Sequence, residues 1–174
     1  MQQGASDDFQ TPPIALNPLL PYLKKEWIIW ECAAGQGNLS TALREKGYQV
    51  ETSDITDTPP RDFLNYEPPS WDCIVTNPPF SIKQEFLQRC YSLQKPFALL
   101  LPLTTFETAK RQALFQRHGV QIILFDKRIN FETPSGKGSG SWFATAWFTN
   151  LLNLPHTLNY ATLNPPTTQK TLNL

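Results

Sequence analysis

Short, almost unbroken apolar runs recur along this 174-residue chain and alternate with stretches of helical periodicity. These runs predict strands at residues 26–31, 48–53, 71–75, 97–103, 122–125 and 142–148. Strands that are apolar on both faces must be covered on both faces, and strands that alternate with helices form mostly parallel sheets. The sequence therefore predicts an α/β fold, with an open, mostly parallel sheet, helices on both of its faces, and ligands beyond the carboxyl ends of the strands.

Three helices are expected between these strands. One follows Gly37 and ends at Gly47, and another runs from about residue 108 to residue 118, with Gly119 just past its end. The third follows Ser81, which with Gln84 has the spacing of a capping box. Its apolar side chains fall on one helical face, so this helix should pack against the sheet: Phe86, Leu87, Cys90 and Tyr91.

Length and composition favour a single domain. The apolar fraction of 40% is sufficient for one core, and we assign residues 1–150 to the folded domain. Residues 151–174 are rich in Thr, Asn and Pro, and Lys170 is their only side chain with a formal charge at pH 7. We expect this segment to be a polar tail with little fixed structure.

The charge balance and the cysteines exclude several classes of protein. Fifteen basic and fifteen acidic side chains cancel, so any nucleic-acid contact must come from a local patch. No window approaches the roughly 20 apolar residues needed to span a bilayer, and no signal peptide is visible, so we expect a cytosolic protein without a membrane partner. Cys32, Cys73 and Cys90 lack metal-site spacing, and we expect them to pack in the core rather than to form a disulfide framework or a metal site.

A glycine turn follows the first predicted strand. Gly35 and Gly37 lack side chains, so a ligand can approach the backbone there, at the start of a helix. Ser40 stands where a dinucleotide fingerprint would have its third glycine, which disfavours an NAD-type oxidoreductase. Asp54 ends the second strand 17 residues after Gly37, close to the spacing of roughly 20 at which an acid binds a ribose. A tight turn without a ligand and a solvated loop acid are the structural alternatives.

A second acid, Asp62, lies eight positions after Asp54 and directly precedes an aromatic residue, Phe63. The Asp62 carboxylate could bond the amino group of an adenine while the ring of Phe63 packs on its face. A turn followed by core residues explains the same pattern equally well. Both alternatives stay open at this point.

The most specific feature is Asn77-Pro78-Pro79-Phe80, at the end of an apolar strand. Two prolines stiffen the backbone and donate no N–H, so the Asn77 side-chain oxygen and the Pro78 carbonyl can act as a fixed pair of acceptors. Two acceptors suit a planar NH2 group whose nitrogen must become pyramidal to attack a methyl group, a case in which positioning replaces a strong base. Phe80 could stack on the ring that carries the amine.

Together these features resemble the amino-methyltransferases that include the DNA adenine methyltransferases, in particular the short phage and prophage type. The resemblance covers residues 8–150 and rests on these stretches: D-D-F-Q-T-P-P (7–13), E-C-A-A-G-Q-G-N-L (31–39), Asp54, D-F-L (62–64), T-N-P-P-F (76–80) and S-W-F-A-T-A-W-F (141–148). It implies a Rossmann-like class I methyltransferase fold and S-adenosylmethionine as the cofactor. Only eight positions separate Asp54 from Asp62, so the sheet should be reduced around its third strand.

The resemblance also implies a role for individual residues. The methionine end of the cofactor would be held by Phe9, Thr11 and Pro12. The cofactor turn would be lined by Glu31, Ala33, Gly35 and Gly37, the ribose would bind Asp54, and the adenine would bind Asp62 and Phe63. The target amine and its ring would be held by the catalytic residues Asn77, Pro78, Pro79 and Phe80.

The favoured hypothesis for function is methylation of adenine N6 in DNA, which requires base flipping because the amine is paired in a duplex. Methylation of guanine N2 in ribosomal RNA or of protein glutamine uses the same kind of motif, and a binding module without turnover is a further alternative. The larger relatives carry a separate target-recognition domain, and none is visible here. The substrate contacts would then fall on the glycine-rich segment 127–140, through Lys127, Arg128 and Lys137.

Overall fold

The computed structural model describes residues 9–131 and 143–164. Its strands are β1 (Ile28–Glu31), β2 (Gln49–Thr52), β3 (Cys73–Thr76), β4 (Phe97–Pro102), β5 (Gln121–Phe125), β6 (Thr145–Asn150) and β7 (Leu158–Ala161). Its helices are α1 (Asn38–Glu45), α2 (Lys83–Leu93) and α3 (Ala109–His118). Short 3-10 turns lie at η1 (Pro13–Leu16), η2 (Leu20–Tyr22), η3 (Phe80–Ile82) and η4 (Leu103–Glu107). Each predicted helix and strand is present, with ends displaced by a few residues.

The strands form one sheet in the order β2-β1-β3-β4-β6-β5-β7. Only β6 runs antiparallel to its neighbours, β4 and β5, and every other adjacent pair is parallel. The carboxyl ends of β1, β2 and β3 therefore meet at one edge of the sheet. The predicted α/β class with a mostly parallel sheet is confirmed.

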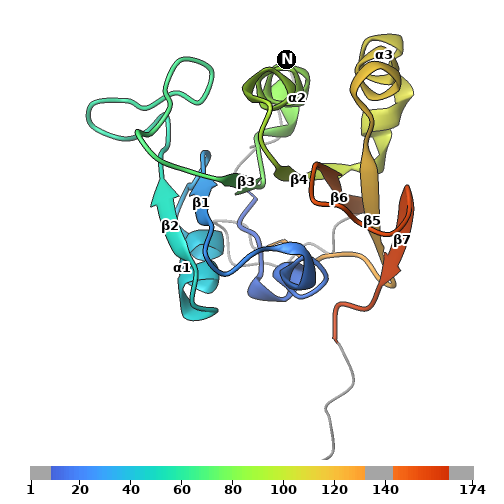
Figure 1. Cartoon of the computed structure of the whole chain (residues 1–174), viewed down its shortest axis with the longest axis horizontal. Helices are drawn as coiled ribbons and strands as arrows, with labels where there is room; N and C mark the ends of the chain where they lie inside the picture. Colours follow the sequence, from blue (N-terminus) through green and yellow to red (C-terminus); the bar gives the residue numbers. More distant parts are fainter. Residues whose placement is uncertain (1–8, 132–142, 165–174) are drawn as a thin grey trace, which may run out of the picture.

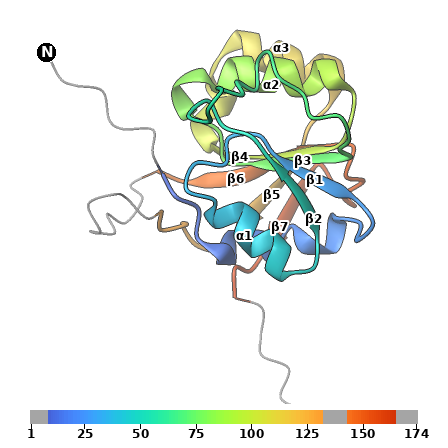
Figure 2. The ribbon, with the colours of Figure 1, turned by 90° about the vertical axis from the view of Figure 1, so that its left-hand side faces the viewer.

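Helices cover both faces of the sheet, as predicted. In Figures 1 and 2, α2 and α3 lie on one face, while α1 and the N-terminal turns η1 and η2 lie on the other. Alternate strand residues point to opposite layers: Ile29 packs with Leu16 and Leu43 below the sheet, whereas Trp30 packs with Phe86 above it. The N-terminal segment is fixed to the sheet because the Trp147 indole donates to the Ala15 carbonyl at 2.8 Å.

The sheet is reduced in the connection between β2 and β3, which contains Asp54 and Asp62, as the short spacing of these two residues predicted. Residues 53–72, between β2 and β3, contain no helix or strand. Side-chain hydrogen bonds hold this connection in place of a ladder, including Trp71 Nε1 to Glu67 Oε1 at 2.8 Å and an Arg61–Asp57 ion pair at 2.8 Å. The predicted trimming is confirmed.

The expectation of little fixed structure after residue 150 is wrong for residues 151–164. β7 pairs in parallel with β5, and Leu152, Leu154 and Leu163 are buried in the core. Buried Asn159 donates to the Ile122 carbonyl at 3.1 Å, so its polar side chain also fastens the segment. A low content of charge predicted a loose tail, but the spaced leucines and the open edge of β5 supply burial and a hydrogen-bond ladder.

The predicted capping box at the start of α2 is also wrong. η3 precedes the helix, and the N-cap residue is Ile82, whose side chain makes no cap hydrogen bond. The 3-10 turn takes up Ser81, so Ser81 does not stand at the cap position.

The three cysteines lie where the sequence predicted, because Cys32, Cys73 and Cys90 are all buried and free.

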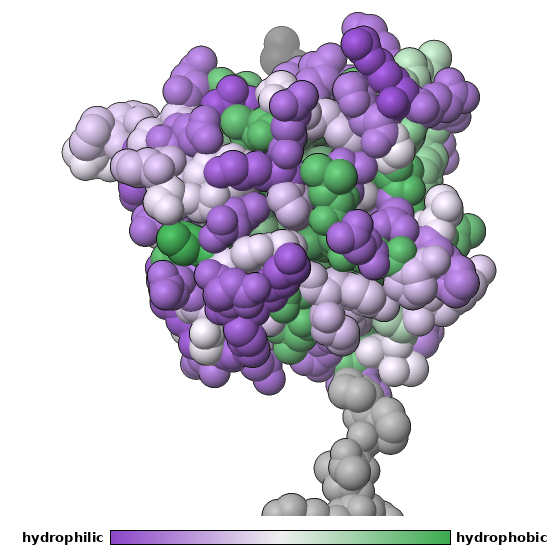
Figure 3. Space-filling model, viewed as in Figure 1, coloured by the Kyte–Doolittle hydropathy of each residue, from purple (hydrophilic) through white to green (hydrophobic). Residues whose placement is uncertain are grey.

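The surface of the molecule is mainly polar on the face shown in Figure 3, where apolar residues form several separate patches. Within residues 9–131 and 143–164, no helix combines the length and the hydropathy that crossing a bilayer requires. In the same ranges, no three His, Cys, Asp or Glu side chains gather closely enough to hold a metal ion.

Candidate active site

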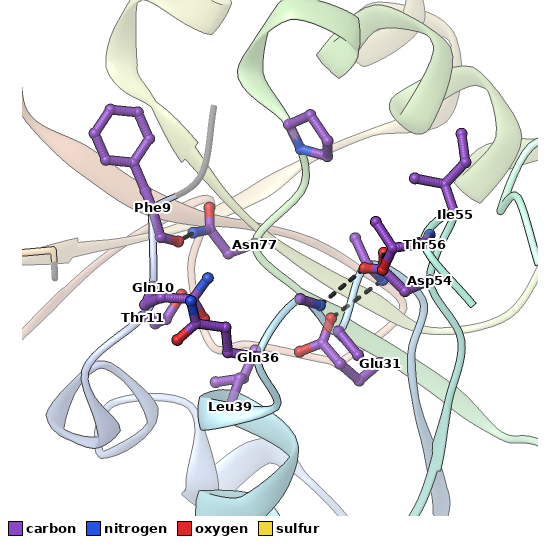
Figure 4. A pocket seen from close by; sticks show the side chains of 14 residues that line it. Phe9, Gln10, Thr11, Glu31, Gln36, Leu39, Asp54, Ile55, Thr56 and Asn77 are labelled. Atoms are coloured by element: carbon purple, nitrogen blue, oxygen red, sulfur yellow. Dashed lines mark hydrogen bonds between the residues drawn. The ribbon is translucent and has the colours of Figure 1, made fainter. Parts of the chain in front are cut away.

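A pocket of about 520 Å³ opens where the carboxyl ends of β1, β2 and β3 meet the N-terminal segment (Figure 4). Fourteen residues line it: Phe9, Gln10, Thr11, Glu31, Ala33, Ala34, Gly35, Gln36, Leu39, Asp54, Ile55, Thr56, Asn77 and Pro79. A second, polar hollow of about 340 Å³ shares Asp54 and the glycine turn with it. The position agrees with the rule that open α/β sheets bind ligands beyond the carboxyl ends of their strands.

The glycine turn after β1 forms one wall of the pocket. Gly35 has a φ of +52° and Gly37 a φ of +84°, values in the left-handed region that other residues rarely adopt. A Cβ at Gly35 would stand 3.3 Å from Nε2 of Gln10, so the N-terminal segment lies close against the turn. The turn is tied to the end of β2, because Ala34 N–H donates to the Ser53 carbonyl at 3.2 Å.

Asp54 is held in one orientation at the end of β2. Its Oδ2 accepts the Gly35 N–H at 2.8 Å, and its Oδ1 accepts the Thr56 N–H at 2.9 Å and the Thr56 hydroxyl at 2.7 Å. Partial burial disfavours the charge, but the Thr56 and Gly35 hydrogen bonds outweigh it and hold the pKa of Asp54 below its ordinary value. The carboxylate is therefore ionised at neutral pH, oriented, and still able to accept hydrogen bonds from a ligand.

Glu31 is the buried acid of the site. It ends β1, is only 1% exposed, and lines the pocket. Its Oε1 accepts the hydroxyl of Thr76 and, at 3.4 Å, the N–H of Ala33. Burial raises the pKa of Glu31 from 4.5 to about 8, and the nearby Asp54 charge adds to this, whereas the two hydrogen bonds oppose it. Without a cationic ligand, the carboxyl is largely protonated at neutral pH.

The raised pKa of Glu31 predicts a pH dependence of folding stability. The folded chain binds a proton that the unfolded chain has lost between pH 4.5 and about 8, so this group's contribution falls as pH rises through that window. Glu31→Gln cannot ionise and should lose less stability over the same range. Thermal unfolding of both proteins from about pH 5 to pH 8 checks this. Parallel curves would contradict the assignment of a raised pKa.

The Asn77 side chain lies at the tip of β3, and its amide nitrogen and amide oxygen differ in their hydrogen bonding. Its Nδ2 donates to the Phe9 carbonyl at 2.9 Å, which fixes the orientation of the amide (Figure 4). Its Oδ1 is buried and has no hydrogen-bond partner among the described residues. A buried acceptor without a partner costs free energy of about 1–3 kcal/mol. An oriented, unsatisfied acceptor beside a pocket is a feature that a ligand N–H would relieve.

Four phenylalanine rings gather next to Asn77: Phe9, Phe80, Phe131 and Phe143. All six pairs of ring centroids lie 5.6 to 6.5 Å apart. Phe9 stacks on Phe80 with an interplanar angle of 24°. The resemblance assigned Phe9 to the methionine end of the cofactor, but the structure turns its ring toward Phe80 and its carbonyl toward Asn77. The N-terminal segment thus contacts both groups proposed to hold the target amine.

Of the 14 residues proposed for the cofactor and the target amine, eight line this pocket and six do not. Pro12 caps η1, Gly37 lines the second hollow, Pro78 is buried and lines neither pocket, and half-buried Phe80 belongs to the four-ring cluster. Neither Asp62 nor Phe63 lines either pocket. Phe63 is 2% exposed and packs on Trp30 and Phe86, while Asp62 Oδ1 accepts the Leu64 N–H at 3.0 Å. The positions of Asp62 and Phe63 favour a turn followed by a core residue over a binding site for the adenine.

The basic residues proposed for the substrate are placed only in part. Lys127 and Arg128 are exposed and follow β5, in the segment that leads to Phe131 of the aromatic cluster. Lys137 lies outside the described residues. The segment 126–131 therefore brings two exposed cations along the chain toward the tip that carries Phe80.

Some pocket residues were missed from the sequence. Ile55 and Thr56 directly follow Asp54, and Ile55 is 64% exposed, which is unusual for a large apolar side chain. Gln10, Gln36 and Leu39 complete the walls. The position of Ile55 after a strand-ending acid was an available signal, although exposure itself could be known only from the structure.

The chain matches known proteins in its fold but not in its sequence. No protein-family model matches the chain, and no curated protein matches it in sequence. Solved structures do match: a protein from Pyrococcus horikoshii described as an RNA methyltransferase has a TM-score of 0.61 at 12% identity, covering 84% of this chain and 88% of its own.

Two further structures match parts of longer chains. A protein from Vibrio vulnificus described as the modification subunit of a type I restriction enzyme has a TM-score of 0.56 at 15% identity, with 96% of this chain and 49% of its own covered. A dimethyladenosine transferase from Plasmodium falciparum has a TM-score of 0.51 at 16% identity, with 81% and 62% covered. This chain thus spans about half of the first protein and less than two thirds of the second. At such identities the likeness concerns the fold alone: the chain has the Rossmann-like fold of class I methyltransferases.

Proposed function

We propose that this chain is an S-adenosylmethionine-dependent methyltransferase that methylates a planar exocyclic amine, with adenine N6 in DNA as its substrate. One observation carries the proposal. At the tip of β3, the Asn77 amide is oriented through its nitrogen, and its buried oxygen is left without a partner among the described residues. Asn77 lines a pocket that also holds Gly35 of the glycine turn and Asp54.

The residues of the pocket fit the proposed cofactor. Its volume of about 520 Å³ lies within the roughly 300–1,000 Å³ typical of small-molecule sites. The Asp54 carboxylate can accept the hydroxyl hydrogens of a ribose, and exposed Ile55 beside it offers an apolar surface for an adenine ring. The carboxyl of Glu31 can ionise beside a cationic methionine end. When bound, S-adenosylmethionine supplies an electrophilic methyl group on a sulfonium.

The chain's own residues act by positioning the amine. Asn77 Oδ1 and the Pro78 carbonyl would accept the two N–H groups, which favours a pyramidal nitrogen whose lone pair can attack the methyl carbon. No strong base is required for this, because the nitrogen becomes cationic and acidic on methylation and then gives its extra proton to water. Phe80 would stack on the target ring, a contact worth about 1–3 kcal/mol.

Two observations support a nucleic-acid substrate. Lys127 and Arg128 are exposed in the segment that leads to Phe131, so their charges can reach a phosphate backbone near the aromatic cluster. The structural neighbours described above include proteins whose descriptions name RNA, dimethyladenosine and restriction modification. A base must leave the duplex to reach the pocket, and an aromatic stacking platform helps to offset the loss of base stacking.

A matched pair of variants tests which apolar residue binds the cofactor. Ile55→Ala should weaken S-adenosylhomocysteine binding by about 5- to 30-fold with little change in stability, because an exposed apolar contact is lost. Phe63→Ala should instead lower the free energy of unfolding by about 3–5 kcal/mol, because it empties the core between Trp30 and Phe86. Calorimetric titration and denaturant unfolding measure the two effects. Tight binding by Ile55→Ala together with weak binding by folded Phe63→Ala would reverse the assignment.

A methyl-acceptor screen tests the proposed function. The chain is incubated with tritiated S-adenosylmethionine and, separately, duplex DNA, single-stranded DNA, ribosomal RNA or protein, and labelled nucleic acid is digested to nucleosides. We expect label in N6-methyl-2′-deoxyadenosine. Label only in N2-methylguanosine or in glutamine would contradict the DNA substrate, and cofactor binding without label in any acceptor would contradict turnover.

A further inference from the structure

Thr76 lies between Glu31, which is proposed to face the cofactor, and Asn77, which is proposed to accept the target amine. It ends β3, directly before Asn77, and is 0% exposed. Its hydroxyl donates to Oε1 of Glu31, at the end of the neighbouring strand β1. One side-chain hydrogen bond therefore joins the acid proposed to face the cofactor to the strand tip that carries the amine acceptor.

The Thr76 side chain contributes a hydrogen bond at this position as well as packing volume. A valine would occupy the same volume at position 76, whereas a buried hydroxyl must find a partner or cost free energy. The partner here is an ionisable group that lines the pocket, and the same oxygen also accepts the Ala33 N–H at 3.4 Å. A change of charge at Glu31 would therefore alter two hydrogen bonds that Glu31 accepts. One comes from Ala33, at the glycine turn, and the other comes from Thr76, which directly precedes Asn77.

On the basis of the proposed function, we infer that Thr76 is a positioning residue whose hydroxyl couples the Glu31 carboxyl to Asn77. A cation bound next to Glu31 would favour the carboxylate, and the carboxylate accepts the Thr76 hydroxyl more strongly than the acid does. The strand tip would then be drawn toward β1 when the cofactor is present. Asn77, whose amide orientation is held by the Phe9 carbonyl, would move with the strand tip when the site is loaded.

The titration of Glu31 can be separated from that of its neighbours. Within residues 9–131 and 143–164, the titratable groups that face it are Asp54, from the loop after β2, and the thiol of Cys32, which directly follows Glu31. Hydrogen bonds keep the pKa of Asp54 below its ordinary value despite its partial burial, and burial raises the pKa of Cys32 well above 9.0. Between about pH 6 and pH 9, Asp54 stays charged and Cys32 stays neutral, so a change in this window belongs to Glu31.

Nuclear magnetic resonance of the empty full-length chain tests the coupling directly. In the wild type, the Glu31 carboxyl carbon and the Asn77 side-chain NH2 signals should shift with one shared midpoint. In Thr76→Val the Glu31 midpoint should rise, because a hydrogen bond that favours the carboxylate is lost, and the Asn77 signals should stop following it. Thr76→Ser should restore both behaviours.

Two controls keep the result interpretable. Thr105→Val removes another fully buried threonine hydroxyl, one without a hydrogen-bond partner among the described residues, and should leave both titrations unchanged. Glu31→Gln should abolish the Asn77 shift while Thr76 is intact. If the Asn77 signals follow Glu31 equally well in folded Thr76→Val, or if they fail to follow it in the wild type, the coupling is refuted.

Binding of S-adenosylhomocysteine separates this inference from the proposed function. We expect Thr76→Val to bind it about 3- to 10-fold more weakly than the wild type, and Thr76→Ser to bind it normally. A wild-type chain that does not bind S-adenosylhomocysteine contradicts the proposed function, and the nuclear magnetic resonance titration then still decides the link between Glu31 and Asn77. Wild-type binding with an unchanged affinity in Thr76→Val contradicts the coupling alone.

Discussion

Replacing Asn77 with alanine should lower the turnover of methyl transfer by about 10² or more, the scale seen when one preorganised polar contact in an active site is removed. The reason is that, among the described residues that line the pocket, Asn77 Oδ1 is the one buried side-chain acceptor without a hydrogen-bond partner. Affinity for S-adenosylhomocysteine should stay within about threefold of the wild type, because the amide faces the amine rather than the ribose. Steady-state kinetics and calorimetric titration give the two values.

A control for Asn77 is available in the same chain. Asn65 is exposed, lines neither pocket, and its Nδ2 contacts Asp62 at 3.4 Å. Asn65→Ala should therefore leave turnover unchanged. If Asn77→Ala lost cofactor affinity and kept its turnover at saturating cofactor, Asn77 would belong to the cofactor half of the pocket instead.

Replacing Asp54 with alanine should have the opposite pattern, with cofactor affinity weakened by about 10- to 100-fold. Hydrogen bonds to charged groups contribute about 1.5–3 kcal/mol, and each 1.4 kcal/mol is a factor of ten in the dissociation constant. The variant would also release the Gly35 N–H and both Thr56 donors, so the turn after β1 should loosen. Turnover at saturating cofactor should fall much less than the affinity.

Asp62 provides the matched control for Asp54. It is also an acid in the connection between β2 and β3, but it accepts the Leu64 N–H and lines neither pocket. Asp62→Ala should keep its affinity for S-adenosylhomocysteine. Equal losses in both variants would restore the role that the resemblance gave to Asp62, and no loss in Asp54→Ala would remove the proposed ribose contact.

The fold was predictable from the sequence where burial on both faces leaves a strong pattern. β3 and β4 are buried at every position, and their sequences, CIVT and FALLLP, are apolar except for Thr76. β7 has only one buried residue, Asn159, which is polar, so its sequence carries no strand pattern. It becomes a strand because β5 offers a free edge and the flanking leucines are buried, and both of these are tertiary effects.

The site was predictable to the extent that it follows strand ends. Asn77 follows directly after β3 and Asp54 lies two residues after β2, and a parallel sheet brings such positions together. The burial of Phe63, the exposure of Ile55 and the turn of Phe9 toward Phe80 depend on side-chain packing between distant segments. No local spacing encodes these contacts, which is why the role given to Phe63 from a dipeptide pattern is not supported by its position.

The most direct test of the account is a crystal structure of the chain with S-adenosylhomocysteine and a short DNA that contains a flipped adenine. We predict the adenine N6 within about 3.2 Å of Asn77 Oδ1, and the ribose hydroxyls of the cofactor product at a similar distance from the Asp54 carboxylate. An adenine amine bonded elsewhere, with Asn77 Oδ1 still unsatisfied, would contradict the central claim that this oxygen is the acceptor for the target amine.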